Sequence, residues 1–253
     1  MNLVMRAGSA AVLCTALATS VAACNPTDPA KPAAASGTAS AAPSKPAGPL
    51  DELSGSEIAQ KAIANLKEAS TVHYAGRAKD SGQTIDMDIT LVSGKGCKGS
   101  MTAGKGSVKV TLIGTTMWLK PDRAFWTANG GNDPTVLAMV ADKWIKTSKT
   151  GDMGSSMSGL CNLNKMLADE VGDTNDLQKG GTTTVNGQPA LRLKATGDPS
   201  VLDVSDTADP RPLRMTDVRS SGRGTLNFTD YNSPVNLTPP PASETVDGKS
   251  IGM

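Results

Sequence analysis

The sequence predicts an α+β fold in which one amino-terminal helix precedes a mainly antiparallel β-sheet. Three observations predict it: a helical repeat of apolar residues after position 54, later segments in which apolar and polar residues alternate, and glycine-rich turns between those segments. Alternation with a period of two is typical of strands with one buried face, and short turns join antiparallel neighbours. The helices are few, so the sheet is expected to dominate the fold.

A short apolar segment at the amino terminus ends at Cys24. Arg6 precedes the apolar run 7–18, which is too short to span a bilayer, so residues 1–23 are expected to form a signal peptide. The run Val21–Cys24 resembles a bacterial lipobox. That resemblance implies that Cys24 receives diacylglycerol and a further acyl chain such as palmitate, and becomes the first mature residue. The alternative is an ordinary secretory cleavage beside a coincidental cysteine.

Composition divides the rest of the chain into a linker, a domain and a tail. Residues 24–50 hold the lipidated cysteine and a stretch rich in Pro, Ala and Ser that has little to bury, so we expect a disordered linker. As a flexible coil it spans roughly 25 to 30 Å. Residues 51–238 suit one domain, and 239–253 begin with three prolines and are expected to be a flexible tail.

The charge balance argues against nucleic acid as a partner. The chain has 25 Lys+Arg and 24 Asp+Glu, and removal of residues 1–23 takes away only Arg6, which leaves 24 of each. A neutral chain lacks the excess of cations that a phosphate backbone requires. We therefore expect the protein to meet the membrane through the lipid on Cys24, on the outer face of the cell membrane, while its protein partner is unknown.

The first helix has a well-defined start. Ser54 and Glu57 fit a capping box, and Leu53 and Ile58 occupy the positions of a hydrophobic staple. Apolar residues then recur on one helical face at positions Ile58, Ala62, Leu66 and Ala69. This segment is therefore predicted to be an amphipathic helix that packs on the sheet.

Three segments show the alternation of strands most clearly, namely 85–91, 108–112 and 191–195. Their apolar positions are expected to share the face that the helices cover. The pair Asn186-Gly187 gives the strongest hairpin signal. The apolar positions are Ile85, Met87, Ile89, Leu91, Val108, Val110, Leu112, Leu191, Leu193 and Ala195.

Two short helices are predicted between the strands. Asp133 and Pro134 fit an N-cap followed by proline at the first helical position, ahead of an apolar segment that includes Met139. An apolar stripe of Leu160, Leu163 and Leu167 predicts the second helix.

The four cysteines reduce to one expected disulfide. Cys14 leaves with the signal peptide and Cys24 carries lipid, so Cys97 and Cys161 are expected to pair in an oxidising compartment. Closure of a loop of about 65 residues contributes roughly 4 kcal/mol in the chain-entropy model. A reactive thiol is the alternative, but nothing near either cysteine favours it.

Residues for catalysis or metal binding are scarce. The chain has one histidine, His73, and no nucleophile-elbow motif. Zinc would lack ligands, and the segment 99–106 departs from a P-loop because Gly106 stands where Ser or Thr should bind magnesium. We therefore expect neither an enzyme nor a cofactor nor a metal site.

Five short motifs accompany this order of elements. They are Gly114–Lys120, Lys143–Ile145, Asn186–Ala190, Pro212–Arg214 and Asp230–Val235. Together they resemble the LppX/LprG-type envelope lipoproteins, which share the fold of the periplasmic carrier LolA. The resemblance implies a strongly curved antiparallel sheet, an unclosed half-barrel, with the amino-terminal helix and two short helices packed on its concave face. It also implies, for some members, a hydrophobic cavity that holds acyl chains.

The sheet itself gives a reason to expect a ligand on that face. Nine or ten strands present more apolar surface than a few short helices can cover, so bound lipid, the membrane or closure of the sheet on itself must cover the rest. Flexible methionines suit a pocket for acyl chains, although they are also common core filler. The candidate cavity residues are Ile85, Met87, Ile89, Leu91, Val108, Val110, Leu112, Trp118, Met139, Leu191 and Leu193.

Two hypotheses of different classes follow. The first is a non-enzymatic lipoprotein that binds or transfers lipid or acyl chains by burying apolar surface. The second is an envelope interaction or sensor module whose sheet closes on its own core and whose polar face meets a protein partner. An enzyme comes third.

Overall fold

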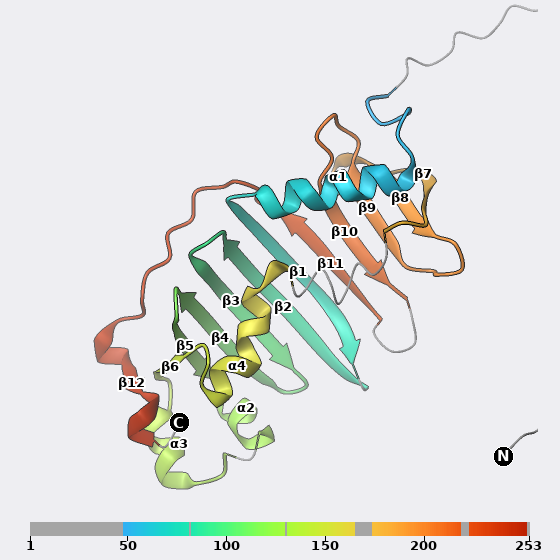
Figure 1. Ribbon diagram of the computed structural model, residues 1–253. Helices are drawn as coiled ribbons and strands as arrows, with labels where there is room; N and C mark the ends of the chain where they lie inside the picture. Colours follow the sequence, from blue (N-terminus) through green and yellow to red (C-terminus); the bar gives the residue numbers. More distant parts are fainter. Residues whose placement is uncertain (1–47, 81, 130, 165–173, 219–222, 252–253) are drawn as a thin grey trace, which may run out of the picture. The chain divides into compact units, whose positions relative to one another are not determined.

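The computed structural model describes residues 48–80, 82–129, 131–164, 174–218 and 223–251 (Figure 1). The expected signal peptide, Cys24 and nearly all of the linker lie outside these residues, as does Leu167 of the second predicted helix. The helices are α1 (Gly55–Glu68), α2 (Arg123–Ala128), α3 (Pro134–Val140) and α4 (Asp152–Ser158), with 3-10 turns η1 (Gly159–Cys161), η2 (Ala242–Glu244) and η3 (Gly248–Ile251). The strands are β1 (Thr71–Asp80), β2 (Gln83–Val92), β3 (Gly96–Ala103), β4 (Gly106–Ile113), β5 (Thr116–Pro121), β6 (Trp144–Ser148), β7 (Leu177–Val185), β8 (Gln188–Ala195), β9 (Val201–Ser205), β10 (Pro212–Asp217), β11 (Gly224–Thr229) and β12 (Thr245–Asp247).

The strands form one sheet of twelve in the order β12-β6-β5-β4-β3-β2-β1-β11-β10-β9-β8-β7. The pairing is antiparallel throughout except between β12 and β6, which run parallel. The outermost strands, β12 and β7, do not pair with each other, so the sheet is unclosed. The prediction of an α+β fold built on an unclosed antiparallel sheet is confirmed, with more strands than the nine or ten expected.

Helix α1 begins as its sequence predicts. The Ser54 side chain accepts from the Glu57 amide, and the Glu57 carboxylate accepts from the Ser54 amide, which completes the capping box. Hydrogen bonds from the Ser54 amide and hydroxyl lower the pKa of Glu57. Helix α1 packs against β7 to β10, and its first residue is glycine because an added Cβ would lie 2.4 Å from the Leu177 carbonyl oxygen.

One face of the sheet carries the core, and we call it the inner face. Cross-strand register places Tyr74, Ile89 and Val110 in one line on this face, with Gly99 between Ile89 and Val110. Residues of α1, α2 and α4 join these strands in one hydrophobic cluster, so the three helices cover the same face. The opposite face, which we call the outer face, carries mostly polar side chains such as His73, Asp88 and Arg214.

Helix α4, Asp152–Ser158, was not predicted, and it continues into η1, which holds Leu160 of the leucine stripe. Leu163 and Asn164 are helical, and the rest of the second predicted helix, with Leu167, lies outside the described residues. Met153 and Met157 lie one helical turn apart and supply the apolar contacts of α4. The glycines and serines around them are weak helix formers, so propensity gave no sign of this helix.

The carboxyl-terminal segment is also ordered differently from the prediction. Residues 239–253 were expected to be a flexible tail, yet Thr245–Asp247 form β12 on the exposed edge of β6. Val246 and Ile251 pack against the cluster of Trp126, Val140 and Ile145. Burial of these side chains and satisfaction of the free β6 edge hold the segment in place.

Candidate functional site

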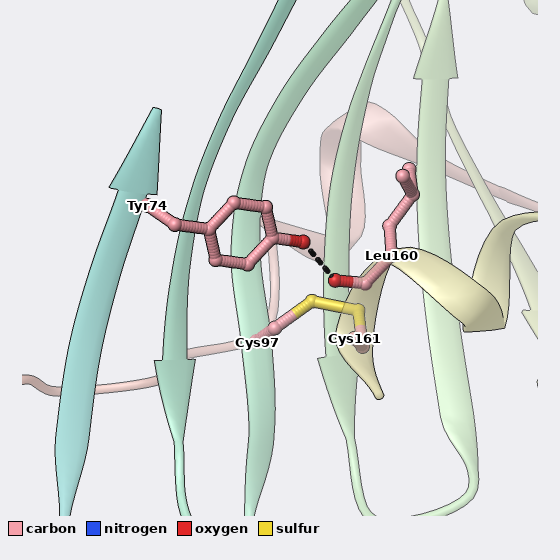
Figure 2. The surroundings of a disulfide bond; sticks show 4 residues. All are labelled: Tyr74, Cys97, Leu160 and Cys161. Carbon is pink, nitrogen blue, oxygen red and sulfur yellow. Dashed lines mark hydrogen bonds between the residues drawn. A yellow bond between two sulfur atoms is a disulfide. The ribbon is translucent and has the colours of Figure 1, made fainter. Parts of the chain in front are cut away.

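The packed middle of the inner face is fastened by a disulfide and a tyrosine (Figure 2). Cys97 of β3 and Cys161 of η1 form the expected bond across 64 positions of sequence, with their Cα atoms 5.4 Å apart. Beside it the Tyr74 hydroxyl donates to the Leu160 carbonyl oxygen. Burial raises the pKa of Tyr74, since the ionised phenolate would lose its hydration. Both contacts hold the end of α4 and η1 against the sheet.

Further along the same strands the inner face is less covered. A cross-strand line runs through Met101, Met87, Gly76, Leu226 and Met215, and we call it the methionine row. Met87, Met101 and Leu226 pack against the core but are only partly buried. Gly76 contributes no side chain, and none fits, because an added Cβ would lie 2.0 Å from the Thr225 carbonyl oxygen. The row therefore combines flexible thioethers with a bare stretch of backbone.

At the other end of these strands a pocket of about 570 Å³ adjoins Cys161, and we call it the disulfide pocket. Its apolar lining comes from Val72, Leu91 and Leu112 of the sheet together with Leu163. Its polar lining comes from turns and element ends, and includes Lys67, Lys95 and Lys149. The volume falls within the range of small-molecule sites. Residues of the inner-face core thus form the apolar part of an accessible pocket.

Most of the candidate cavity residues lie on the inner face. Two of them, Leu91 and Leu112, line the disulfide pocket, and Met87 belongs to the methionine row. Ile85 lies next to that row and is partly buried. The remaining five are buried in the main core, namely Ile89, Val108, Val110, Leu191 and Leu193.

The prediction that Trp118 and Met139 line a cavity on the inner face is wrong. Trp118 pairs with Thr111 and Lys146, which places it on the outer face, where only 8% of it is exposed. Lys98 lies in the same cross-strand line, opposite Thr111. Its Nζ donates to the Asn236 carbonyl oxygen at 3.3 Å, so the carboxyl-terminal segment contacts this line on the outer face. Met139 is 47% exposed on α3 and belongs to none of the three hydrophobic clusters. Neither side chain lies on the inner face.

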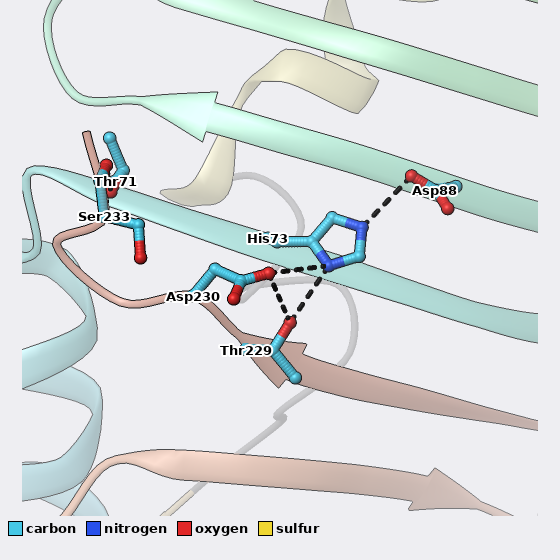
Figure 3. A network of polar contacts seen from close by, with 6 residues as sticks. All are labelled: Thr71, His73, Asp88, Thr229, Asp230 and Ser233. Atoms are coloured by element: carbon cyan, nitrogen blue, oxygen red, sulfur yellow. Dashed lines mark hydrogen bonds and ion pairs between the residues drawn. The ribbon is translucent and has the colours of Figure 1, made fainter. Parts of the chain in front are cut away.

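The single histidine lies in a polar network on the outer face (Figure 3). His73 Nε2 is 3.0 Å from Asp88 Oδ1, and Nδ1 is 3.0 Å from Thr229 Oγ1 and 3.6 Å from Asp230 Oδ2. The Thr229 hydroxyl donates to Asp230 Oδ2 at 3.1 Å. The arrangement ties β1 to its two neighbours, β2 and β11.

A second outer-face network surrounds a buried carboxylate. Asp203 is 1% exposed and accepts from Arg192 Nε at 2.8 Å and from Arg214 Nη2 at 2.7 Å. Hydrogen bonding to Asp203 raises the pKa of Arg192. Two cations around one buried carboxylate satisfy it fully, so this is a structural contact across β8, β9 and β10.

Within the described part of the chain, no group of three or more His, Cys, Asp or Glu residues is arranged to hold a metal ion. No helix among the same residues is long and apolar enough to cross a membrane.

These features define the class of the fold: an unclosed, mostly antiparallel sheet with a helix-covered apolar face and a polar outer face. No protein-family model matches the chain, and no curated protein matches it. The solved structures that resemble it include the lipoprotein LppX from Mycobacterium tuberculosis, at 15% identity and a TM-score of 0.47, covering 72% of this chain and 97% of that one. LprF from Mycobacterium bovis is similar at 14% identity and a TM-score of 0.48, with 74% and 96% covered.

Proposed function

We propose that this protein is a lipoprotein, anchored through Cys24 to the outer face of the cell membrane, that binds or transfers a hydrophobic ligand without covalent chemistry. One observation carries the proposal: the disulfide pocket is an accessible site whose apolar lining, Val72, Leu91 and Leu112, belongs to the main core of the inner face. Side chains of this kind bind by removing apolar surface from water, at about 25 cal/mol per Å². They offer no acid, base or nucleophile.

The methionine row supports the same function at the other end of the face. Its partly buried thioethers rotate about three bonds and are polarizable, so they adapt to chains of different shape. An acyl chain that lay on this row would exchange water for these side chains. The proposal therefore has two candidate sites on the inner face, the methionine row around Met87 and Met101 and the disulfide pocket.

A second candidate function is favoured by the packing between these two regions. Ile89 and Leu193 are 0% exposed and Val110 is 1% exposed, so the middle of the inner face is a closed core. A closed core of this kind is sufficient for an envelope interaction or sensor module that binds no ligand. The two candidates differ in whether the protein carries lipid.

The anchor is tested by the substitution Cys24→Ser in the exported full-length chain. Without the thiol no diacylglycerol is attached, so the variant is expected to leave the membrane fraction and to remain folded, because the anchor is separate from the core. Membrane fractionation, intact mass and circular dichroism measure the three properties. An acylated, membrane-bound variant would show that the lipobox interpretation is wrong.

The ligand is tested on the same released variant. Native mass spectrometry of Cys24→Ser protein, purified without detergent, is expected to show bound lipid in addition to the chain mass. Protein that carries no lipid and takes up none from added vesicles would favour the interaction module.

A further inference from the structure

The rim of the disulfide pocket carries charge of one sign. Lys67 lies in the last turn of α1, Lys95 lies in the turn between β2 and β3, and Lys149 follows β6. The described residues that line the pocket include no Asp or Glu. Within the described chain none of the three lysines forms an ion pair. Three exposed cations from separate elements thus border one pocket without a protein counterion.

The backbone that carries two of these lysines is held in place. Lys95 donates its amide to the Val92 carbonyl oxygen at 3.0 Å, and its own carbonyl accepts from Gly114 at 2.9 Å. Lys149 donates its amide to the Thr115 carbonyl oxygen at 3.0 Å. These bonds join the turns that follow β2, β4 and β6 into one frame, so the positions of the two lysines relative to each other are set by the sheet.

Elsewhere in the sheet, three arginines form ion pairs with aspartates. Arg77 contacts Asp86, and Arg192 and Arg214 share Asp203. A helix carboxyl terminus accounts for one cation, Lys67, through the helix dipole. It does not account for Lys95 and Lys149, which belong to no helix. The uniform charge of this rim therefore points to a negatively charged group that is supplied from outside the chain.

The floor of the pocket determines what kind of anion fits. A free phosphate or carboxylate ion would use only the polar lining, and a neutral lipid would use only the apolar lining of Val72, Leu91 and Leu163. A molecule with an apolar chain and an anionic head group uses both parts of the pocket. Resting on the proposed function, we infer that the disulfide pocket binds an anionic amphiphile, with its acyl chain on the floor and its phosphate or carboxylate at Lys67, Lys95 and Lys149.

The test compares two lipids that differ only in charge. Oleoyl lysophosphatidate and monooleoylglycerol share one acyl chain, and only the first carries a phosphate. Their Kd values are measured by isothermal titration calorimetry with Cys24→Ser full-length protein, below the concentration at which either lipid aggregates. Exposed charge pairs contribute modestly, so three together are expected to make the phosphate lipid bind roughly tenfold more tightly, with the difference shrinking as salt is added.

A matched pair of triple variants locates the effect. Lys67→Gln, Lys95→Gln and Lys149→Gln together are expected to make the two Kd values equal. The control, Lys105→Gln, Lys109→Gln and Lys194→Gln, changes the net charge by the same amount at exposed positions that do not line the pocket, and should leave the tenfold difference intact. Circular dichroism checks that both variants are folded.

Three other outcomes would overturn the inference. Equal binding of the two lipids to the parent protein, at low and high salt, overturns the inference but leaves the proposed function standing. Binding of neither lipid overturns both. Inorganic phosphate that binds as tightly as the phosphate lipid would show a site for free anions and would also overturn the inference.

Discussion

Ile89 and Met87 are two residues apart on the same strand and the same face, yet only Ile89 is fully buried. Ile89 lies in the line of Tyr74 and Val110, which η1 and α4 cover through the disulfide and the Tyr74 hydroxyl. Met87 lies in the methionine row, where no such fastening contact is present among the described residues. The strand pattern decides which face is apolar, and the tethered helix decides which part of that face is closed core.

Removal of the disulfide is expected to have the largest effect on this comparison. Replacing Cys97 and Cys161 with serine frees a loop of about 65 residues, so the free energy of unfolding should fall by about 4 kcal/mol, within a usual range of 2 to 5. Calorimetric melting of the exported protein, with and without the two substitutions, measures the loss.

Loss of the disulfide should also change the exposure of the inner face. Once η1 is released, the packed middle should become accessible, and hydrogen exchange at the amides of β3 should rise more than at those of β8. Equal melting temperatures, or free thiols at both cysteines in natively exported parent protein, would contradict the role given to the bond.

The next largest effect is expected from a larger side chain placed either in the closed core or in the methionine row. Ile89→Trp inserts a larger ring into closed core and should cost about 1 to 3 kcal/mol or more. Met87→Trp places the same ring where the face is partly exposed, so it should cost distinctly less and should lower the amount of bound lipid. Urea unfolding and native mass spectrometry measure the two effects. Equal destabilisation by both substitutions, with no lipid on the parent protein, would favour a closed interaction module.

The inner face could be predicted from the sequence because strand alternation is local. Ile85 to Leu91 alternate strictly with polar residues, and the register confirms their shared face. Trp118 was misplaced because its neighbours Met117 and Leu119 are apolar too, so three buried residues in a row hide the alternation. Burial on both faces of a strand cannot be assigned from hydrophobicity alone.

Features that depend on distant segments left no local signal. Strand β12 has three residues and exists because β6 offers an edge about 100 positions earlier. The lysines of the disulfide pocket come from three places in the chain, and each is an ordinary surface residue in its own segment. The disulfide was the exception, since counting cysteines by compartment left a single pair.

The smallest expected effect concerns the Tyr74 hydroxyl. Tyr74→Phe keeps the ring in the core and removes one hydrogen bond to the Leu160 carbonyl, so at pH 7 it should cost about 0.5 to 1.5 kcal/mol. The pKa of Tyr74 is raised by burial, so the folded state favours the neutral phenol. The contribution of the neutral Tyr74 phenol to the free energy of unfolding is complete below the pKa of the unfolded state, near 10, and is lost as the pH rises above that value.

The phenylalanine variant has no such proton to lose at position 74. Its deficit should therefore shrink as the pH rises from 9 to 11, and urea unfolding across this range measures the change. Tyr231→Phe is the matched control, because burial also raises the pKa of Tyr231, whose hydroxyl donates to the Pro212 carbonyl oxygen at 2.6 Å away from the disulfide. Both variants should share the alkaline trend, but only Tyr74→Phe should loosen η1 and speed hydrogen exchange at β3. A similar increase in both variants would mean that Tyr74 fills the core without fastening the segment that closes it.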